Sequence, residues 1–143
     1  MLFRRSLLLL LALGALPLPA QTVPAFDKSM LITNDDRGKT LKVNGVLRVE
    51  SDKVVFWGKK EGEMFSTPYA DVTKLVYERT KKPRYSAGLL LAWPLLFTKE
   101  KQHYITIESK GAYAFIKVHK HRFRGAIAAL ESASGIGVER LEE

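Results

Sequence analysis

The residues with the clearest capacity for chemistry are basic, and they gather just before a predicted C-terminal helix. Lys120, Arg122 and Arg124 stand there, next to His119 and His121. A helix N-terminus exposes free backbone N–H groups, and nearby cations add attraction for a phosphate or carboxylate. A solvated basic surface would have the same composition. Lys120, Arg122 and Arg124 are therefore candidate anion-binding residues.

Residues that could support catalysis or bind a metal form no complete set. His119 and His121 would share one face of a strand and could contact a metal ion, but no third histidine or carboxylate lies close in sequence. The chain has no cysteine, which excludes thiolate-bound zinc, iron–sulfur clusters, a thiol nucleophile and disulfides. No Gly-x-Ser-x-Gly nucleophile motif occurs. We predict a non-enzymatic protein without cofactor or metal.

An apolar segment with basic residues on both sides is the most unusual feature of the chain. Residues 87–97 are all apolar, about half the length of a membrane span, and Pro94 would interrupt a regular helix or strand. The pattern predicts insertion at a membrane surface, with the cations contacting anionic headgroups. The candidate membrane- or partner-binding residues are Leu89, Leu90, Leu91, Trp93, Leu95, Leu96, Phe97, Lys81, Lys82, Arg84, Lys99 and Lys101.

Two other roles for this apolar segment stay open. It could fold back and cap an open end of the domain, or it could contact a protein, including a second copy of the chain. The expected partner is therefore an anionic lipid surface or a protein, and a homo-oligomer is among the options. Nucleic acid is not expected, because the N-terminus predicts export.

The first twenty residues have the pattern of a secretory signal peptide. Arg4 and Arg5 precede a short apolar stretch, and the stretch ends in prolines and Ala20. We expect cleavage after Ala20; cleavage after Ala25 and an uncleaved anchor are the alternatives. The location predicted from this pattern is periplasmic or extracellular, including association with a membrane.

The remaining composition is that of one small globular domain. The chain has 143 residues, 46% hydrophobic and 27% charged, with a formal net charge of +8. A strong positive charge favours anionic partners. We divide the chain into a signal peptide (1–20), an extended lead-in (21–39) and a domain (40–141) with an apolar insertion at about 80–102.

Strand periodicity begins near Thr40, and a helical pattern closes the chain. Apolar residues alternate with polar ones from Thr40 to about residue 118, and Asn44-Gly45 predicts a hairpin turn. Apolar residues from Phe123 to Ser134 then recur at helical spacing, and Gly135 is a stop signal. The order is six or seven short strands followed by one helix.

This order resembles a pleckstrin-homology-like (PH-like) domain in its bacterial PH or GRAM-like form. The resemblance rests on residues 46–57, on residues 65–75 and on the helix from Arg122 to Ser134. It implies a mainly β fold, a barrel of about six or seven antiparallel strands closed by a C-terminal α-helix. PH-like domains bind lipids or peptides, so the sequence predicts an exported binding module. Its expected action is peripheral association with an anionic membrane through the apolar segment.

Overall fold

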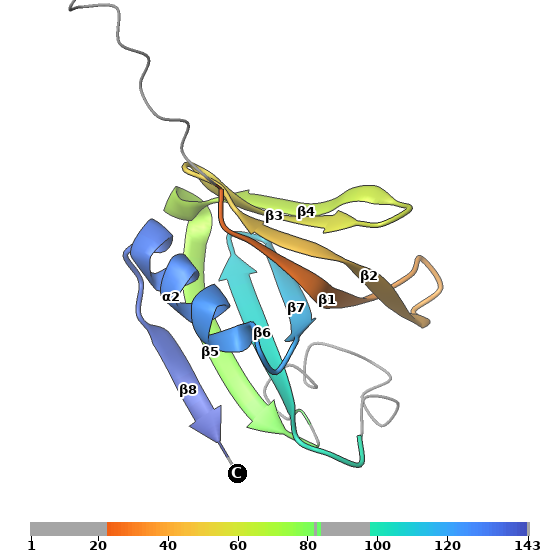
Figure 1. Cartoon of the computed structure of the whole chain (residues 1–143). Coiled ribbons are helices and arrows are strands. Elements are labelled where there is room, and N and C mark those ends of the chain that lie inside the picture. The colour runs from red at the N-terminus through yellow and green to blue at the C-terminus, as the bar shows by residue number, and fades with distance from the viewer. Residues whose placement is uncertain (1–22, 82, 84–97, 143) are drawn as a thin grey trace, which may run out of the picture.

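The computed structural model describes residues 23–81, 83 and 98–142 (Figure 1). The predicted signal peptide and the apolar residues 87–97 lie outside these residues. The signal peptide and its cleavage site therefore stay predictions.

Within the described part of the chain the fold is mainly β, as predicted, with one long helix (Figure 1). The sheet has eight strands in the order β4-β3-β2-β1-β7-β6-β5-β8. Neighbouring strands are antiparallel except for β5 and β8, which are parallel. The elements are β1 (Ala25–Asn34), β2 (Thr40–Val49), β3 (Lys53–Gly58), β4 (Gly62–Pro68), the 3₁₀ turn η1 (Tyr69–Asp71), β5 (Val72–Thr80), β6 (Gln102–Ser109), β7 (Ala112–Val118), α2 (Phe123–Ser134) and β8 (Val138–Glu142).

The predicted barrel is a strongly curved but open sheet (Figure 1). Its end strands, β4 and β8, are not paired with each other. The helix covers the concave face, where Ala126, Ile127 and Leu130 are buried in the core with side chains from most of the strands. Gly135 ends the helix with a φ of 73° and donates its N–H to the Glu131 carbonyl at 3.0 Å.

The segment predicted as an extended lead-in is extended, but it is a central strand. β1 pairs with β2 on one side and with β7 on the other. Its pairing with β2 shifts between Phe26 and Ser29, and Lys28 has a φ of 56° at this bulge. The bulge interrupts the alternation of apolar and polar residues, which is why the sequence pattern begins only at Thr40.

The predicted hairpin turn at Asn44-Gly45 is wrong, because both residues lie inside β2. Gly45 is paired with Gly58 of β3. A Cβ atom on Gly45 would lie 2.1 Å from the Trp57 carbonyl oxygen. This glycine therefore permits close approach of two strands, which the sequence alone does not distinguish from a turn.

β8 was not predicted, and it extends the sheet to an eighth strand. It runs parallel to β5, with Val138 beside Leu75 and Arg140 beside Tyr77. Only five residues form it, three of them charged, so the sequence looks like a polar tail. The free edge of β5 supplies the hydrogen-bond partners that make it a strand.

A second apolar cluster lies on the convex face of the sheet. Ile32, Tyr104 and Phe115 are between 1% and 3% exposed, and the rings of Tyr104 and Phe115 stack with centroids 5.0 Å apart. β6 is buried at five successive positions, His103 to Ile107. The middle of the sheet is therefore buried on both faces.

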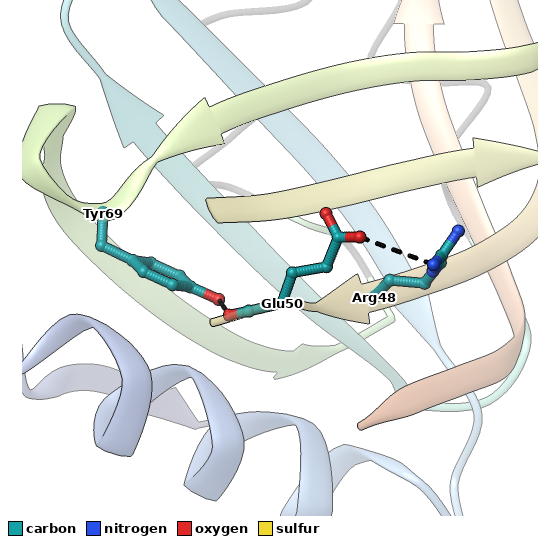
Figure 2. A network of polar contacts seen from close by, with 3 residues as sticks. All are labelled: Arg48, Glu50 and Tyr69. Carbon is teal, nitrogen blue, oxygen red and sulfur yellow. Dashed lines mark hydrogen bonds and ion pairs between the residues drawn. The ribbon is translucent and has the colours of Figure 1, made fainter. Parts of the chain in front are cut away.

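Tyr69 ties the 3₁₀ turn to the turn between β2 and β3 (Figure 2). Its hydroxyl donates to the Glu50 carbonyl oxygen at 2.6 Å, and the Glu50 carboxylate lies 3.5 Å from the Arg48 guanidinium. Burial, with the charges of Asp52 and Glu50, raises the pKa of Tyr69 to about 12. The pKa of Tyr104 is also raised to about 12: burial dominates, a hydrogen bond with Thr98 opposes it, and Glu78 adds to it.

Replacing Gly45 by alanine is expected to destabilise the protein by about 3 kcal/mol, because the added methyl group forces β2 away from β3. Gly137→Ala is the matched control, since a Cβ there meets no atom within 4 Å. Urea unfolding of both variants measures the difference. Equal stability of the two variants would show that the sheet adapts freely at Gly45.

The raised tyrosine pKa values predict a loss of stability at alkaline pH. The unfolded tyrosines ionise near pH 10, whereas folded Tyr69 and Tyr104 hold their protons to about pH 12. The unfolded state thus loses protons first, and the stabilising contribution falls as the pH rises from about 10 to about 12. The variant Tyr69→Phe/Tyr104→Phe should lose less unfolding free energy than wild type as the pH rises from about 10 towards about 12. An identical loss in both proteins would show that the raised pKa values of Tyr69 and Tyr104 do not cause the alkaline loss of stability.

Candidate functional site

The end of β5 and the start of β6 lie side by side at one end of the β5–β6 hairpin. The Thr98 backbone N–H donates to the Lys81 carbonyl oxygen at 2.9 Å, and Thr80 pairs with Gln102 in the β5–β6 ladder. In the sequence, the residues between Lys81 and Thr98 connect β5 to β6. Most of the predicted insertion at about 80–102 lies outside the described residues, so it stays a prediction.

Three of the predicted membrane- or partner-binding residues lie in the described part of the chain, all at the base of this insertion. Lys81 and Lys99 are exposed, and Lys101 is half-buried. The other nine lie outside the described residues: Lys82, Arg84, Leu89, Leu90, Leu91, Trp93, Leu95, Leu96 and Phe97.

Lys101 belongs to a larger group of cations around a cavity of about 260 Å³, which we call the lysine cavity. The strands bring this group together, since Lys117 of β7 pairs with Met30 of β1 and with Tyr104 of β6. Lys28 lies at the β1 bulge. The lining residues are Lys28, Met30, Asn44, Glu100, Lys101, Gln102, Lys117, Val118, His119 and Lys120.

The electrostatic state of His119 reflects this positive surrounding. Desolvation lowers the pKa of His119, and the charges of Lys28, His121, Lys120 and Arg122 lower it further. His119 and His121 lie in the loop between β7 and α2 rather than on a strand, with ring centroids 5.2 Å apart. Within the residues that the structure describes, no group of three or more metal-ligating side chains is present.

The structure brings Lys120 and Arg124 to one surface hollow and pairs Arg122 with an acidic residue instead. Lys120 lines the lysine cavity, and it also shares a surface hollow of about 330 Å³ with Arg124. Arg122 instead pairs with Asp27 of β1, with 3.5 Å between Nη2 and Oδ1. Arg124 lies over the Phe123 ring, 5.6 Å from its centroid.

Neither Lys28 nor Lys117 was among the site residues predicted from the sequence, and both line the lysine cavity. Lys117 carried a usable signal, because it falls on the face of β7 opposite Ile116 and Val118. Lys28 carried none, since the bulge that directs it to the cavity depends on pairing with β2.

A second cavity, of about 780 Å³, lies between α2 and the ends of three strands, and we call it the arginine cavity. Its floor holds a stack of rings: the His103 and Phe123 centroids are 4.0 Å apart, and those of Tyr77 and Phe123 are 5.4 Å apart. The Tyr77 hydroxyl and His103 Nδ1 share a hydrogen bond of 2.6 Å. The lining residues are Tyr77, Arg79, His103, Phe123, Arg124, Ile127, Ala128, Glu131 and Arg140.

No local pattern in the sequence indicates this second site. Arg79 and Arg140 are distant in sequence, and they become neighbours only because β8 pairs with β5. Since β8 was not predicted, the proximity of Arg79 and Arg140 could not be predicted either.

No helix in the described part of the chain is long and apolar enough to cross a membrane. No protein-family model matches the chain, and no curated protein matches it either.

Solved structures match the fold at low sequence identity. One is the structure of the Spt16D Pob3N heterodimer, with a TM-score of 0.54 and 10% identity, covering 87% of this chain. This chain spans 56% of that neighbour's length. Another is the C-terminal domain of an unknown protein from Leishmania infantum, with a TM-score of 0.51 and 13% identity, covering 94% of this chain and 96% of that one. Together with the strand order and the C-terminal helix, the likeness shows a PH-like fold.

Proposed function

We propose that this protein is an exported, non-enzymatic binding module of the bacterial PH or GRAM-like kind, which associates peripherally with anionic membrane surfaces. The observation that carries the proposal is the lysine cavity beside the base of the insertion. Lys101 belongs to both features, so the cations of the fold lie beside the described residues that follow the apolar segment in the sequence.

The charges on this surface have the sign and number that the proposal needs. Lys28, Lys101, Lys117 and Lys120 line the lysine cavity, and Glu100 is the acidic residue among its lining. Each basic side chain near an anionic surface contributes on the order of 1 kcal/mol. Four such side chains give a useful attraction at low salt, which weakens beyond a Debye length of about 10 Å at 0.1 M salt.

The apolar residues would supply the part of the binding that salt does not screen. Each large side chain that leaves water contributes about 1.5 to 3 kcal/mol when fully buried. Leu89, Leu90, Leu91, Trp93, Leu95, Leu96 and Phe97 are the residues proposed to insert. Lys81, Lys82, Arg84, Lys99 and Lys101 are the flanking cations proposed to hold headgroups.

A protein-interaction or homo-oligomerising module is the second candidate, using the same apolar segment without a lipid role. The Spt16D Pob3N neighbour is a heterodimer, so protein contact occurs in that assembly. The two candidates differ in their response to salt. Membrane association weakens with ionic strength, whereas a mainly apolar dimer persists in salt and dissociates on dilution.

A third role for the apolar segment is to fold back on the domain, and the nearly complete burial of Tyr104 and Phe115 on the convex face is compatible with it. Thr98, the first described residue after the apolar segment, forms a hydrogen bond with Tyr104. A segment that packs on the sheet would stabilise the fold and would not contact lipid. Co-sedimentation with anionic vesicles, described next, distinguishes this outcome, because a protein whose apolar segment is packed on the sheet would not sediment with them.

Reversing two charges of the lysine cavity is expected to weaken membrane binding by about tenfold or more. The variant Lys117→Glu/Lys120→Glu is compared with Lys59→Glu/Lys60→Glu, which makes the same charge change in the exposed turn between β3 and β4. Full chains are mixed with phosphatidylcholine vesicles with and without phosphatidylglycerol, and the bound fraction is measured by co-sedimentation. All proteins share residues 1–22, so the contribution of this stretch cancels.

Circular dichroism checks that both variants fold, and velocity sedimentation at low and high salt reports dimers. The proposal expects salt-sensitive binding by wild type and by the control variant. It expects binding by Lys117→Glu/Lys120→Glu that is weaker by about tenfold or more. Wild-type binding that ignores phosphatidylglycerol, or equal binding by both variants, would contradict it.

A further inference from the structure

We infer that the arginine cavity binds a small organic anion, with a carboxylate or phosphate group joined to an aromatic or apolar body. The cavity is distinct from the lysine cavity, and its use requires no membrane. This inference therefore stands apart from the proposed function.

Three arginines from three elements converge on this cavity. Arg79 comes from β5, Arg124 from α2 and Arg140 from β8. Glu131 is the acidic residue among the lining, and it is already engaged: its carboxylate lies 3.6 Å from the Arg140 guanidinium and accepts the Val138 backbone N–H at 3.3 Å. The lining therefore keeps an excess of positive charge that Glu131 does not balance.

Arginine is the residue type best suited to an organic acid. Its planar guanidinium offers paired N–H donors that match the two oxygens of a carboxylate or phosphate. The three arginines line the cavity and are exposed, so their side chains can adjust to an anion. A lysine-rich surface would attract the same charge without this directional match.

The interior of the cavity suits an apolar body rather than a bare ion. Ile127 is 4% exposed, Tyr77 1% and His103 8%, so Phe123, the half-buried ring of the stack, is the most accessible part of the floor. A volume of about 780 Å³ falls within the range of about 300 to 1,000 Å³ that is typical of small-molecule sites. A ligand that presents its anionic group to the arginines can place an aromatic ring on this floor.

The position of the cavity follows from the register of the strands. Arg79 pairs with His103, and His103 pairs with Val118, just before the loop that leads into α2. The helix therefore begins directly over the ends of β5 and β6. The fixed start of α2 holds Phe123 against His103, so the floor exists without a ligand.

The probe for the test is phenyl phosphate, titrated into the full chain without vesicles. Binding is followed by the NMR shifts of the Phe123 backbone amide and of the Ile127 methyl groups. We expect saturable shifts, and weaker binding of inorganic phosphate, which lacks the ring. The variant Arg79→Gln/Arg124→Gln should bind phenyl phosphate about tenfold more weakly, or worse. The control Arg37→Gln/Lys39→Gln makes the same charge change in the exposed turn after β1 and should keep the wild-type affinity.

A second variant fills the cavity and leaves every arginine in place. Ala128 is exposed on α2 and lines the cavity, so Ala128→Trp should abolish the phenyl phosphate shifts. Ser132→Trp places the same side chain on the same helix but outside this cavity, and it should bind like wild type.

Four outcomes would overturn the inference. They are the absence of saturable shifts, equal affinity for phosphate and phenyl phosphate, full binding by Ala128→Trp, and shifts that vanish instead when Lys117 and Lys120 are replaced by glutamine. The last would assign the anion to the lysine cavity.

Discussion

The contact between α2 and the concave face of the sheet is the interaction on which the rest of the structure depends. An open curved sheet exposes an apolar surface unless another element covers it, and Ala126, Ile127 and Leu130 provide that cover. Each buried leucine or isoleucine contributes about 1.5 to 3 kcal/mol, so this face of the helix fixes its position firmly. Its first residue, Phe123, is then held against Tyr77 and His103. The arginine cavity is a consequence of that placement.

The two cavities flank the same end of the sheet from opposite faces. His103 and Arg79 belong to the concave side, with Tyr77, while Lys117 and Met30 belong to the convex side, with Tyr104. Adjacent residues of one strand therefore serve different surfaces, as the alternation of side chains in a strand requires. One end of the molecule thus gathers the arginines, the lysines and the base of the apolar insertion. Both proposed binding surfaces therefore lie at this end of the described structure.

Local patterns in the sequence predicted the parts of the fold that local chemistry determines. The terminal helix, its end at Gly135 and the strand-rich stretch from Thr40 to about residue 118 were predicted correctly, because periodicity and glycine placement decide them. Features that depend on a distant partner were not. β8 needs the edge of β5, and the bulge at Lys28 needs β2. Gly45 shows the ambiguity most directly, since close strand approach and a tight turn both favour glycine.

The candidate sites divide in the same way. The lysines that flank the apolar segment were named as candidates from sequence, because charge and apolar runs are visible without a structure, and they stay a prediction. Arg79 and Arg140 were not found, because β-sheet register brings them together across a long stretch of chain. Arg124 was found, but for the helix terminus rather than for the cavity that it lines.

We propose that the apolar segment enters an anionic membrane, and the tryptophan in this segment can report on that entry. The chain has two tryptophans, Trp57 in β3 and Trp93 in the segment, so Trp57→Phe leaves Trp93 as the sole emitter. Its fluorescence is measured with phosphatidylglycerol vesicles that contain brominated lipid, at low and high salt. We predict emission at shorter wavelength and quenching by the bromine atoms at low salt, both reversed at high salt. Emission that is unchanged by vesicles and unquenched by brominated lipid would contradict the account.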